Sequence, residues 1–466
     1  MSKKIVSFGV EAMNTVKRWG LIGIAAAPLL GSAAEERKPN IILILADDLG
    51  YGDVGFTGGE IQTPHLDRLA AEGVVLTDFH ANGATCTPSR AALLTGRYQQ
   101  RSGLVNALAE RDPDYDFKGL APQEVTLPSL MRGAGYRSAL FGKWHLGSQP
   151  DAQPLRQGFD VFIGNLGGHV DHISRRGSGG KYDWHNGFEL FEEKGYVAHL
   201  LTAHALDFIR ENQENPFFIL LSHACPHGPI QLPGDRPIYI ETGIDRSQRA
   251  REDKGKYPQM IGEMDAGIGS ILDELERLGL DEKTLVIFTS DNGPHPQVGS
   301  AGPYRGKKAE LYEGGHRVPF AARWPGTIPG GSVRGDTAML MDLLPTFLDL
   351  AGLEPPAEPV MDGISLYPLL RRGNELPRRT LFWDNVGSRA VRDGIWKMVS
   401  VRDRPAWRTE LYRLDTDPGE ARDLSQEHPE ILERLRHSHD QWAGEMRRGA
   451  ISQPFYKPQN ESGGSK

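Results

Sequence analysis

Four continuous apolar runs stand out along the chain, and each leads directly into polar residues. They lie at residues 41–46, 138–142, 217–222 and 284–290. Uninterrupted apolar runs of this length are typical of strands buried on both faces of a sheet. The segments between them have helical spacing, at residues 64–72, 127–134, 197–212 and 257–278. Strands that alternate with helices predict an α/β fold, in which helices flank a large, mainly parallel sheet.

The pattern changes after about residue 355, where Pro355, Pro356 and Pro359 interrupt the chain. Short strand-like segments follow at residues 380–383, 389–392, 396–401 and 410–414, and a helical segment lies at about 430–447. We therefore expect a smaller C-terminal antiparallel sheet packed by one helix. The predicted domains are a signal peptide at 1–34, a catalytic domain at 35–360, a C-terminal α+β subdomain at 361–456 and a disordered tail at 457–466.

The first residues of the chain predict export. Basic residues precede an apolar stretch at 21–30, and the small residues Ser32, Ala33 and Ala34 follow it. This order is that of a secretory signal peptide. A membrane anchor is the alternative, but the stretch is too short to span a bilayer and contains Pro28. We expect an exported protein, periplasmic or secreted, with no membrane partner after signal cleavage.

Charge and cysteine content narrow the classes of function. The formal net charge is −8, so the chain lacks a global basic field, and we expect no nucleic-acid partner. Cys86 and Cys225 are the two cysteines, which excludes a disulfide scaffold.

Cys86 opens the segment Cys-Thr-Pro-Ser-Arg, where a helix is expected to begin. Pro88 fits the first helical position, Thr87 can cap it, and Gly96 fits its end. A helix N-terminus favours an anion and would lower the pKa of a thiol placed there. Arg90 follows Cys86 by four residues and can lie on the same face. A buried structural cysteine is the alternative interpretation.

Oxygen-bearing side chains follow two of the predicted strands. Asp47 and Asp48 come after the first strand, and Asp291 and Asn292 come after the last. Ligands of open α/β sheets bind outside the carboxyl ends of the strands, so we expect these side chains to meet there. Adjacent carboxylates repel each other unless a cation neutralises them, and an all-oxygen set favours a hard divalent cation. Turn or capping residues are the alternative for Asp47 and Asp48.

The segment from Cys86 to Arg97 resembles the signature of the type I sulfatases, which belong to the alkaline-phosphatase superfamily. Residues 141–147, 224–229 and 305–315 are similar to further landmarks of that family. The resemblance extends over about residues 38–446. It implies an alkaline-phosphatase-like fold and a sulfuric ester hydrolase. In that family a maturation enzyme oxidises the cysteine to formylglycine, and the hydrate of this aldehyde is the nucleophile.

The resemblance also implies a role for each residue of the candidate site. Arg90 would hold the hydrated nucleophile. His227, with Lys308, would protonate the leaving alcohol, and His145 would remove a proton from the remaining hydroxyl. The catalytic set implied in this way is Cys86, Arg90, Lys143, His145, His227 and Lys308.

The implied metal is one Ca²⁺, with Mg²⁺ or Mn²⁺ left open by the ligand types. Its ligands would be Asp47, Asp48, Asp291, Asn292 and the formylglycine oxygen at Cys86. Lys143 and Lys308 would hold the sulfate oxygens together with the metal. Nearby, Glu313 and Arg317 are assigned a structural role as an ion pair.

A glycine-rich loop at residues 167–187 carries basic and aromatic side chains. We expect it to form a wall of the substrate pocket, where basic groups meet further sulfates and Trp184 stacks on a sugar ring. An ordinary surface loop is the alternative. The candidate substrate-binding residues are His172, Arg175, Arg176, Trp184 and His295. This loop favours a sulfated carbohydrate or polysaccharide over a small aryl sulfate.

Two other functions are compatible with parts of this pattern. A phosphomonoester or phosphonate hydrolase on the same scaffold would favour phosphate over sulfate release from matched esters. A non-catalytic protein that binds sulfated glycans would retain affinity without turnover. The complete catalytic set favours the sulfatase.

Overall fold

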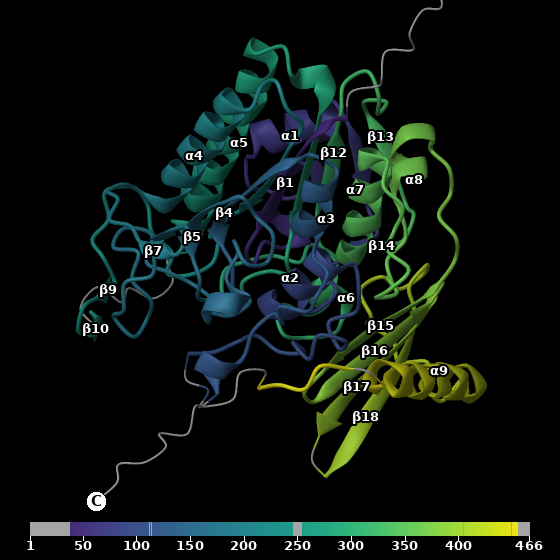
Figure 1. Ribbon diagram of the computed structural model, residues 1–466. Helices are drawn as coiled ribbons and strands as arrows, with labels where there is room; N and C mark the ends of the chain where they lie inside the picture. The colour runs from purple at the N-terminus through teal and green to yellow at the C-terminus, as the bar shows by residue number, and fades with distance from the viewer. Residues whose placement is uncertain are drawn as a thin grey trace, which may run out of the picture. The chain divides into compact units, whose positions relative to one another are not determined.

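The computed structural model describes residues 38–454 apart from 111, 113, 246–253, 404 and 449 (Figure 1). The predicted signal peptide at 1–34 and the predicted tail at 457–466 lie outside the described residues. The domain boundaries stay predictions. Among the helices of the described part, none combines the length and apolar character needed to cross a membrane.

Within the described residues, ten strands form one mixed, mainly parallel sheet in the order β13-β2-β12-β11-β1-β8-β4-β5-β6-β7. The strands are β1 (Asn40–Ala46), β2 (Val74–Leu76), β4 (Arg137–Lys143), β5 (Val161–Asn165), β6 (His185–Asn186), β7 (Glu189–Leu190), β8 (Phe217–Ser222), β11 (Thr284–Ser290), β12 (Phe320–Arg323) and β13 (Ser332–Arg334). The apolar runs predicted as strands are confirmed as β1, β4, β8 and β11, which are neighbours and parallel. Leu43 of β1 lies opposite both Ile287 and Leu220.

Helices cover both faces of this sheet, and the alternation of β1 side chains shows why. Ile41, Leu43 and Leu45 pack into one apolar core, whereas Ile42 and Ile44 pack into another. The first core is shared with α2 (Cys86–Thr95), α3 (Leu127–Gly133), α7 (Leu343–Ala351) and α8 (Tyr367–Arg372). The second core is shared with α1 (Pro64–Ala71), α4 (Val197–Glu211) and α5 (Tyr257–Arg277), which lie together in Figure 1. A strand buried on both faces is therefore apolar at every position.

The C-terminal part confirms the predicted antiparallel sheet and its helix. In the described segment 380–413, the strands β15 (Thr380–Asn385), β16 (Ser388–Asp393), β17 (Trp396–Asp403) and β18 (Ala406–Arg413) pair in sequence order. The helix α9 (Pro429–Arg447) packs on them through Leu435 and Trp442 (Figure 1). The remaining elements are short: β3 (Phe79–His80) with β14 (Ala338–Met339), β9 (Tyr239–Ile240) with β10 (Gly243–Ile244), and α6 (Glu313–His316).

Candidate active site

The candidate residues converge at the carboxyl ends of the four neighbouring strands β11, β1, β8 and β4. Asp47 and Asp48 follow β1, Asp291 and Asn292 follow β11, Lys143 ends β4, and His227 follows β8. Backbone hydrogen bonds extend beyond the strands: Asp291 N donates to Ala46 O at 3.1 Å, and Asp47 N donates to Cys225 O at 3.0 Å. The expected edge of the sheet therefore holds the site.

Cys86 is the first residue of α2, two positions earlier than predicted for the helix start. Thr85, which is extended, occupies the N-cap position. The hydroxyl of Thr87 is engaged elsewhere, because it donates to His145 O at 3.0 Å and accepts from Leu108 N at 3.1 Å. The prediction that Pro88 begins the helix and Thr87 caps it is therefore wrong, while Gly96 ends the helix in the left-handed conformation, as predicted.

Cys86 is 2% exposed. Its burial raises the pKa of the thiol to about 12, outweighing the opposite effect of Lys143 and Lys308. The sequence prediction of a lowered thiol pKa is therefore wrong, because depth in the fold dominates over the helix terminus. An unmodified Cys86 would be a protonated, weak nucleophile at neutral pH.

Three carboxylates surround the thiol. One potential ligand atom from each of Asp47, Asp48, Asp291 and Cys86 lies within 4.8 Å of the others, and all four residues are buried. Burial and the charge of Asp47 raise the pKa of Asp291. Oδ1 of Asn292, also buried, has no hydrogen-bond partner within the described residues. These oxygens and this unsatisfied amide fit a hard divalent cation.

Three basic side chains pair with the three carboxylates. Lys143 Nζ donates to both oxygens of Asp47 at 2.7 and 2.9 Å. Lys308 Nζ donates to Asp48 Oδ2 at 2.7 Å and lies 3.6 Å from Cys86 Sγ. Burial lowers the pKa of Lys308, but the charge of Asp48 raises it by more, so the pKa lies above the usual range for a lysine. Asp48 correspondingly has a pKa well below the usual range, because Lys308, His227 and Lys143 outweigh its burial.

Arg90 completes the charge balance of this cluster. Its Nε donates to Asp291 Oδ2 at 2.9 Å, and its Nη1 donates to Lys143 O at 3.0 Å. The three carboxylates and the three basic groups cancel, so a divalent cation would give the cluster a net positive charge. Such a charge suits an oxyanion substrate.

Two histidines approach the cluster with defined ring orientations. Nε2 of His145 lies 2.8 Å from Leu108 O and must donate to it, which leaves Nδ1 with a lone pair. That Nδ1 is buried and has no hydrogen-bond partner in the described part of the chain. Nδ1 of His227 donates to Gly228 O at 2.7 Å, and its Nε2 lies 3.5 Å from Asp48 Oδ2. Burial lowers the pKa of both histidines well below the usual range.

His169 and Gly168 were not among the predicted site residues, although both lie in the glycine-rich loop. The His169 ring stacks on the His227 ring, with centroids 5.5 Å apart and an interplanar angle of 17°. Burial lowers the pKa of His169 to about 4. Gly168 lies against the His145 ring, where a Cβ would come within 2.7 Å. Only the histidine-rich composition of the loop pointed to these positions.

The predicted substrate-binding residues take up different positions. His172 is buried and its Nε2 lies 3.3 Å from His227 O, while His295 N donates to Asp48 O at 2.9 Å. Arg176 donates to Gly180 O at 2.7 Å. Trp184 is 0% exposed and its indole nitrogen donates to Glu193 at 3.1 Å. Because the indole lies in the apolar core, it offers no ring face to a sugar, contrary to the expectation.

A second group of potential metal ligands comprises His80, Glu313 and His316. Basic side chains already occupy it, since Lys397 Nζ lies 2.9 Å from Glu313 Oε1 and 3.1 Å from His316 Nε2. The expected ion pair between Glu313 and Arg317 is confirmed at 3.1 Å. This charge pattern favours a structural network over a cation site.

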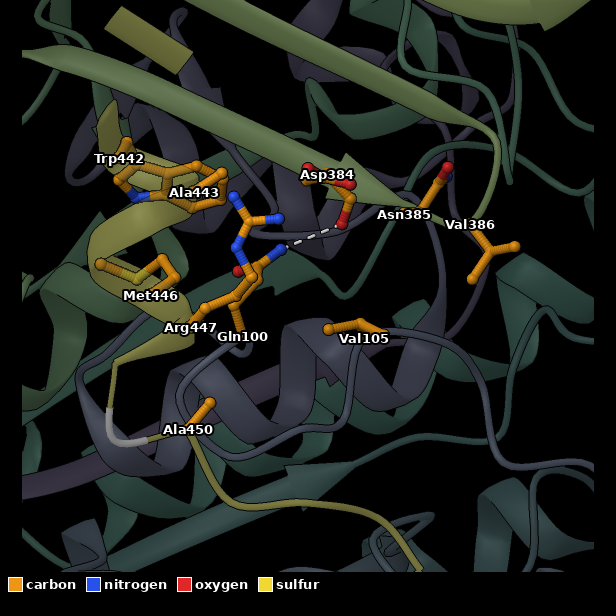
Figure 2. A pocket seen from close by; sticks show the side chains of 10 residues that line it. All are labelled: Gln100, Val105, Asp384, Asn385, Val386, Trp442, Ala443, Met446, Arg447 and Ala450. Atoms are coloured by element: carbon orange, nitrogen blue, oxygen red, sulfur yellow. Dashed lines mark hydrogen bonds between the residues drawn. The ribbon is translucent and has the colours of Figure 1, made fainter. Parts of the chain in front are cut away.

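A cavity of about 250 Å³ lies between α9 and the turn after β15 (Figure 2). Figure 2 shows Trp442 and Met446 of α9 on one side and Asn385 and Val386 on the other. Its lining includes none of the predicted site residues.

Comparisons with known proteins agree with this arrangement. The sulfatase family model matches residues 39–353, and the model of the C-terminal part of N-sulphoglucosamine sulphohydrolase matches residues 305–443. The N-acetylgalactosamine-6-sulfatase of Canis lupus familiaris is 36% identical over 426 residues, which cover 86% of this chain and 79% of that protein. The arylsulfatase A of Homo sapiens is 34% identical over 475 residues, which cover 88% of each chain. The crystal structure of Ps i-CgsB in complex with k-i-k-neocarrahexaose has a TM-score of 0.78 and 28% identity, covering 91% of this chain and 96% of that chain.

Proposed function

Because the chain belongs to the sulfatase family and is a sulfuric ester hydrolase, we propose that it cleaves sulfate esters of a carbohydrate with a formylglycine at position 86 and one calcium ion. The observation that carries this proposal is the position of Cys86 at the head of α2, within 4.8 Å of three buried carboxylates. Family membership sets aside the phosphonate hydrolase and the non-catalytic glycan-binding protein.

Asp47, Asp48, Asp291 and Asn292 would hold the calcium ion. When both groups are present, the formylglycine supplies a hydrated aldehyde as nucleophile and the calcium ion supplies positive charge beside the sulfate oxygens. The unsatisfied Oδ1 of Asn292 supports its inclusion among the ligands.

The residues of the chain itself bind the sulfate and move protons. Lys143 and Lys308, which now contact the carboxylates, would hold the non-bridging oxygens of the ester. His227 would protonate the leaving alcohol from Nε2 as an imidazolium, since Nδ1 keeps its proton on Gly228 O; the Asp48 carboxylate, 3.5 Å from Nε2, favours this charged form. His145 would accept a proton at Nδ1 during sulfate release, since Nε2 is held by Leu108 O. Arg90 would orient the nucleophile from its anchored position on Asp291.

The relatives support a carbohydrate substrate. One relative is an N-acetylgalactosamine-6-sulfatase, and the structure of another was determined with a neocarrahexaose. Export to the periplasm or outside the cell, as the N-terminal sequence predicts, would place the enzyme where sulfated polysaccharides occur.

The test measures modification and turnover together. We expect mass spectrometry of protein from a maturation-competent host to find the peptide containing position 86 as the aldehyde. Defined sulfated oligosaccharides should release inorganic sulfate, and Cys86→Ala should abolish release without unfolding the protein. Full activity with an unmodified thiol would overturn the formylglycine assignment. Hydrolysis of aryl sulfates alone would overturn the carbohydrate assignment.

A further inference from the structure

A cavity of about 400 Å³ lies outside the acidic cluster, at the start of α4. We call it the Arg175 cavity. Its lining includes Arg175, Lys194, Gly195, Tyr196, His199 and Asp235. The first turn of α4 borders it and adds partial positive charge from the helix N-terminus.

Arg175 is fixed by a buried turn. Its backbone is left-handed (φ 58°), and its N–H donates to Asp171 O at 2.8 Å. The Asp171 carboxylate is 0% exposed and accepts from Ile173 N and Ser174 N at 2.9 and 2.8 Å. It also accepts from Ile238 N. The loop is therefore an ordered wall that holds Arg175 in place.

The Arg175 guanidinium is incompletely satisfied. The residue is 7% exposed, and Nη1 donates to Gly195 O at 2.7 Å. Nε has no hydrogen-bond partner among the described residues, and Asp235, the carboxylate of the cavity lining, pairs with Lys256 instead. An unpaired buried donor is costly, and the edge formed by Nε and Nη2 matches the two oxygens of a sulfate or carboxylate.

The other charged groups at this cavity leave it open to an anion. Lys194 is exposed and adds a second positive charge. The Asp235 carboxylate is neutralised by Lys256, whose Nζ lies 2.8 Å away. His199 pairs with Glu263 at 2.6 Å. Arg175 and Lys194 therefore remain as the basic groups available to a ligand.

Two buried aromatic side chains lie between the cavity and the active site. Tyr196, which lines the cavity, packs on His172 with ring centroids 5.7 Å apart. His172 in turn lies 3.3 Å from the carbonyl oxygen of His227. Helix α4 packs on β4 and β8 and precedes β8 along the chain, so it begins at the sheet edge where these parallel strands end, which is the edge that holds the acidic cluster.

We propose that the Arg175 cavity is a second anion subsite, which binds a sulfate or carboxylate group on a sugar unit next to the one being desulfated. This inference rests on the proposed carbohydrate substrate. It assigns to the enzyme a preference for chains that carry a further negative charge.

The first experiment compares oligosaccharides of one backbone that carry the scissile sulfate alone, with a second sulfate, or with a carboxylate. We expect the wild type to prefer one of the doubly anionic substrates by about tenfold or more in kcat/KM, and Arg175→Ala and Lys194→Ala to remove most of that preference. The doubly anionic substrate with the higher kcat/KM identifies the anion, sulfate or carboxylate, that the cavity binds. Lys181→Ala, an exposed lysine of the same loop outside the cavity, should keep the preference. A preference that survives both cavity variants would overturn the subsite.

A binding measurement separates failure of the subsite from failure of the proposed function. Calorimetric titration with sucrose octasulfate uses Cys86→Ala protein, which does not turn over. We expect the double variant Cys86→Ala, Arg175→Ala to bind sucrose octasulfate about tenfold or more weakly than Cys86→Ala alone. Equal affinity with and without Arg175 overturns the subsite even if oligosaccharides are cleaved. Weakened binding together with cleavage of aryl sulfates alone supports the anion site and overturns the carbohydrate substrate.

Discussion

At the scale of single residues, the site uses backbone conformations that non-glycine residues rarely adopt. Asp48, His145 and Ala309 have φ values of 64°, 56° and 75°. Each such residue costs roughly 1–3 kcal/mol. Hydrogen bonds from other segments hold them: His145 N donates to Leu166 O at 3.1 Å, and Ala309 N donates to Ala84 O at 2.7 Å. Part of the stability of the fold therefore maintains the geometry of the site.

Gly168 is the residue at which a single methyl group should disturb this geometry. A Cβ there would lie 2.7 Å from Cε1 and Nε2 of His145, whose ring is buried and bonded to Leu108 O. We expect Gly168→Ala to displace the ring and reduce kcat/KM at least about tenfold, because small displacements of catalytic groups are costly. The free energy of unfolding should fall by about 1–3 kcal/mol. Steady-state sulfate release and urea denaturation measure the two effects.

Gly179→Ala is the matched control for this substitution. Gly179 lies in the same loop, and the closest atom to an added Cβ is Glu110 Oε2 at 3.7 Å, an ordinary contact. It should retain activity. Equal activities of the two variants would contradict the steric role of Gly168.

At the scale of elements, α5 is tied to the segment after β1 by one buried carboxylate. Asp53 ends the 3₁₀ turn η1 (Tyr51–Asp53), and its Oδ2 accepts from Gly50 N and from Tyr257 Oη, both at 2.8 Å. Its Oδ1 accepts from Ser300 N at 2.9 Å. Burial raises the pKa of Asp53 to about 6, although these hydrogen bonds lower it.

The raised pKa makes the contribution of Asp53 to stability depend on pH. The pKa of Asp53 in the folded protein lies above its value in the unfolded chain. The contribution of Asp53 to the free energy of unfolding therefore falls as pH rises from about 4 to about 6. Tyr257→Phe removes a donor to the charged form, which moves the folded pKa further upward. We expect the free energy of unfolding to fall by about 1 kcal/mol at pH 5, where Asp53 is mostly protonated, and by about 2 kcal/mol at pH 8, where it is ionised, because hydrogen bonds to charged groups are stronger. Urea denaturation at the two pH values checks this.

Tyr182→Phe provides the control at this scale. The Tyr182 hydroxyl donates to the backbone oxygen of Phe191 at 3.0 Å, a group that does not titrate. Loss of this hydrogen bond should lower the free energy of unfolding by the same amount at both pH values. If Tyr257→Phe behaved in the same way, Asp53 would not be ionised in the native state at pH 8.

The sequence predicted the long elements well because their signals are local. The runs at 41–46 and 284–290 correspond to β1 and β11 almost residue for residue, since burial on both faces requires continuous apolar residues. The short strands β2 and β13 were not predicted, because two- and three-residue pairings depend on partners far along the chain. The residues of the candidate site were found through motifs, whereas the high thiol pKa of Cys86 depends on burial, which is a tertiary property.

At the scale of the whole described molecule, the C-terminal sheet supports the segment that carries Lys308. Arg305 Nη1 donates to Tyr412 Oη of β18 at 2.8 Å, and Lys397 of β17 pairs with Glu313 at 2.9 Å. Both contacts lie within a few residues of Lys308 on either side. The C-terminal sheet therefore contributes to the site without supplying a predicted catalytic residue.

The proposed calcium ion would act at the same scale, because its ligands come from segments separated by more than two hundred residues. Without it, Asp47, Asp48 and Asp291 stay buried together. We expect a chelator to abolish sulfate release and to lower the thermal midpoint by roughly 3–5 °C, since an ion at about a thousand times its Kd stabilises the native state by about 4 kcal/mol. Scanning calorimetry with and without chelator measures the shift, and Ca²⁺ should restore it at lower concentration than Mg²⁺.

Asp291→Asn and Asp349→Asn separate the ion from general effects of charge. Asp291 supplies a potential ligand atom, so its variant should bind less metal and respond less to the chelator. Asp349, an exposed carboxylate on α7, should leave the chelator response at the wild-type size. The two substitutions remove the same charge, and only the first removes it from the cluster. If chelation left the midpoint and the activity of the wild type unchanged, the balance of three carboxylates by Lys143, Lys308 and Arg90 would suffice for the site, and the metal assignment would be wrong.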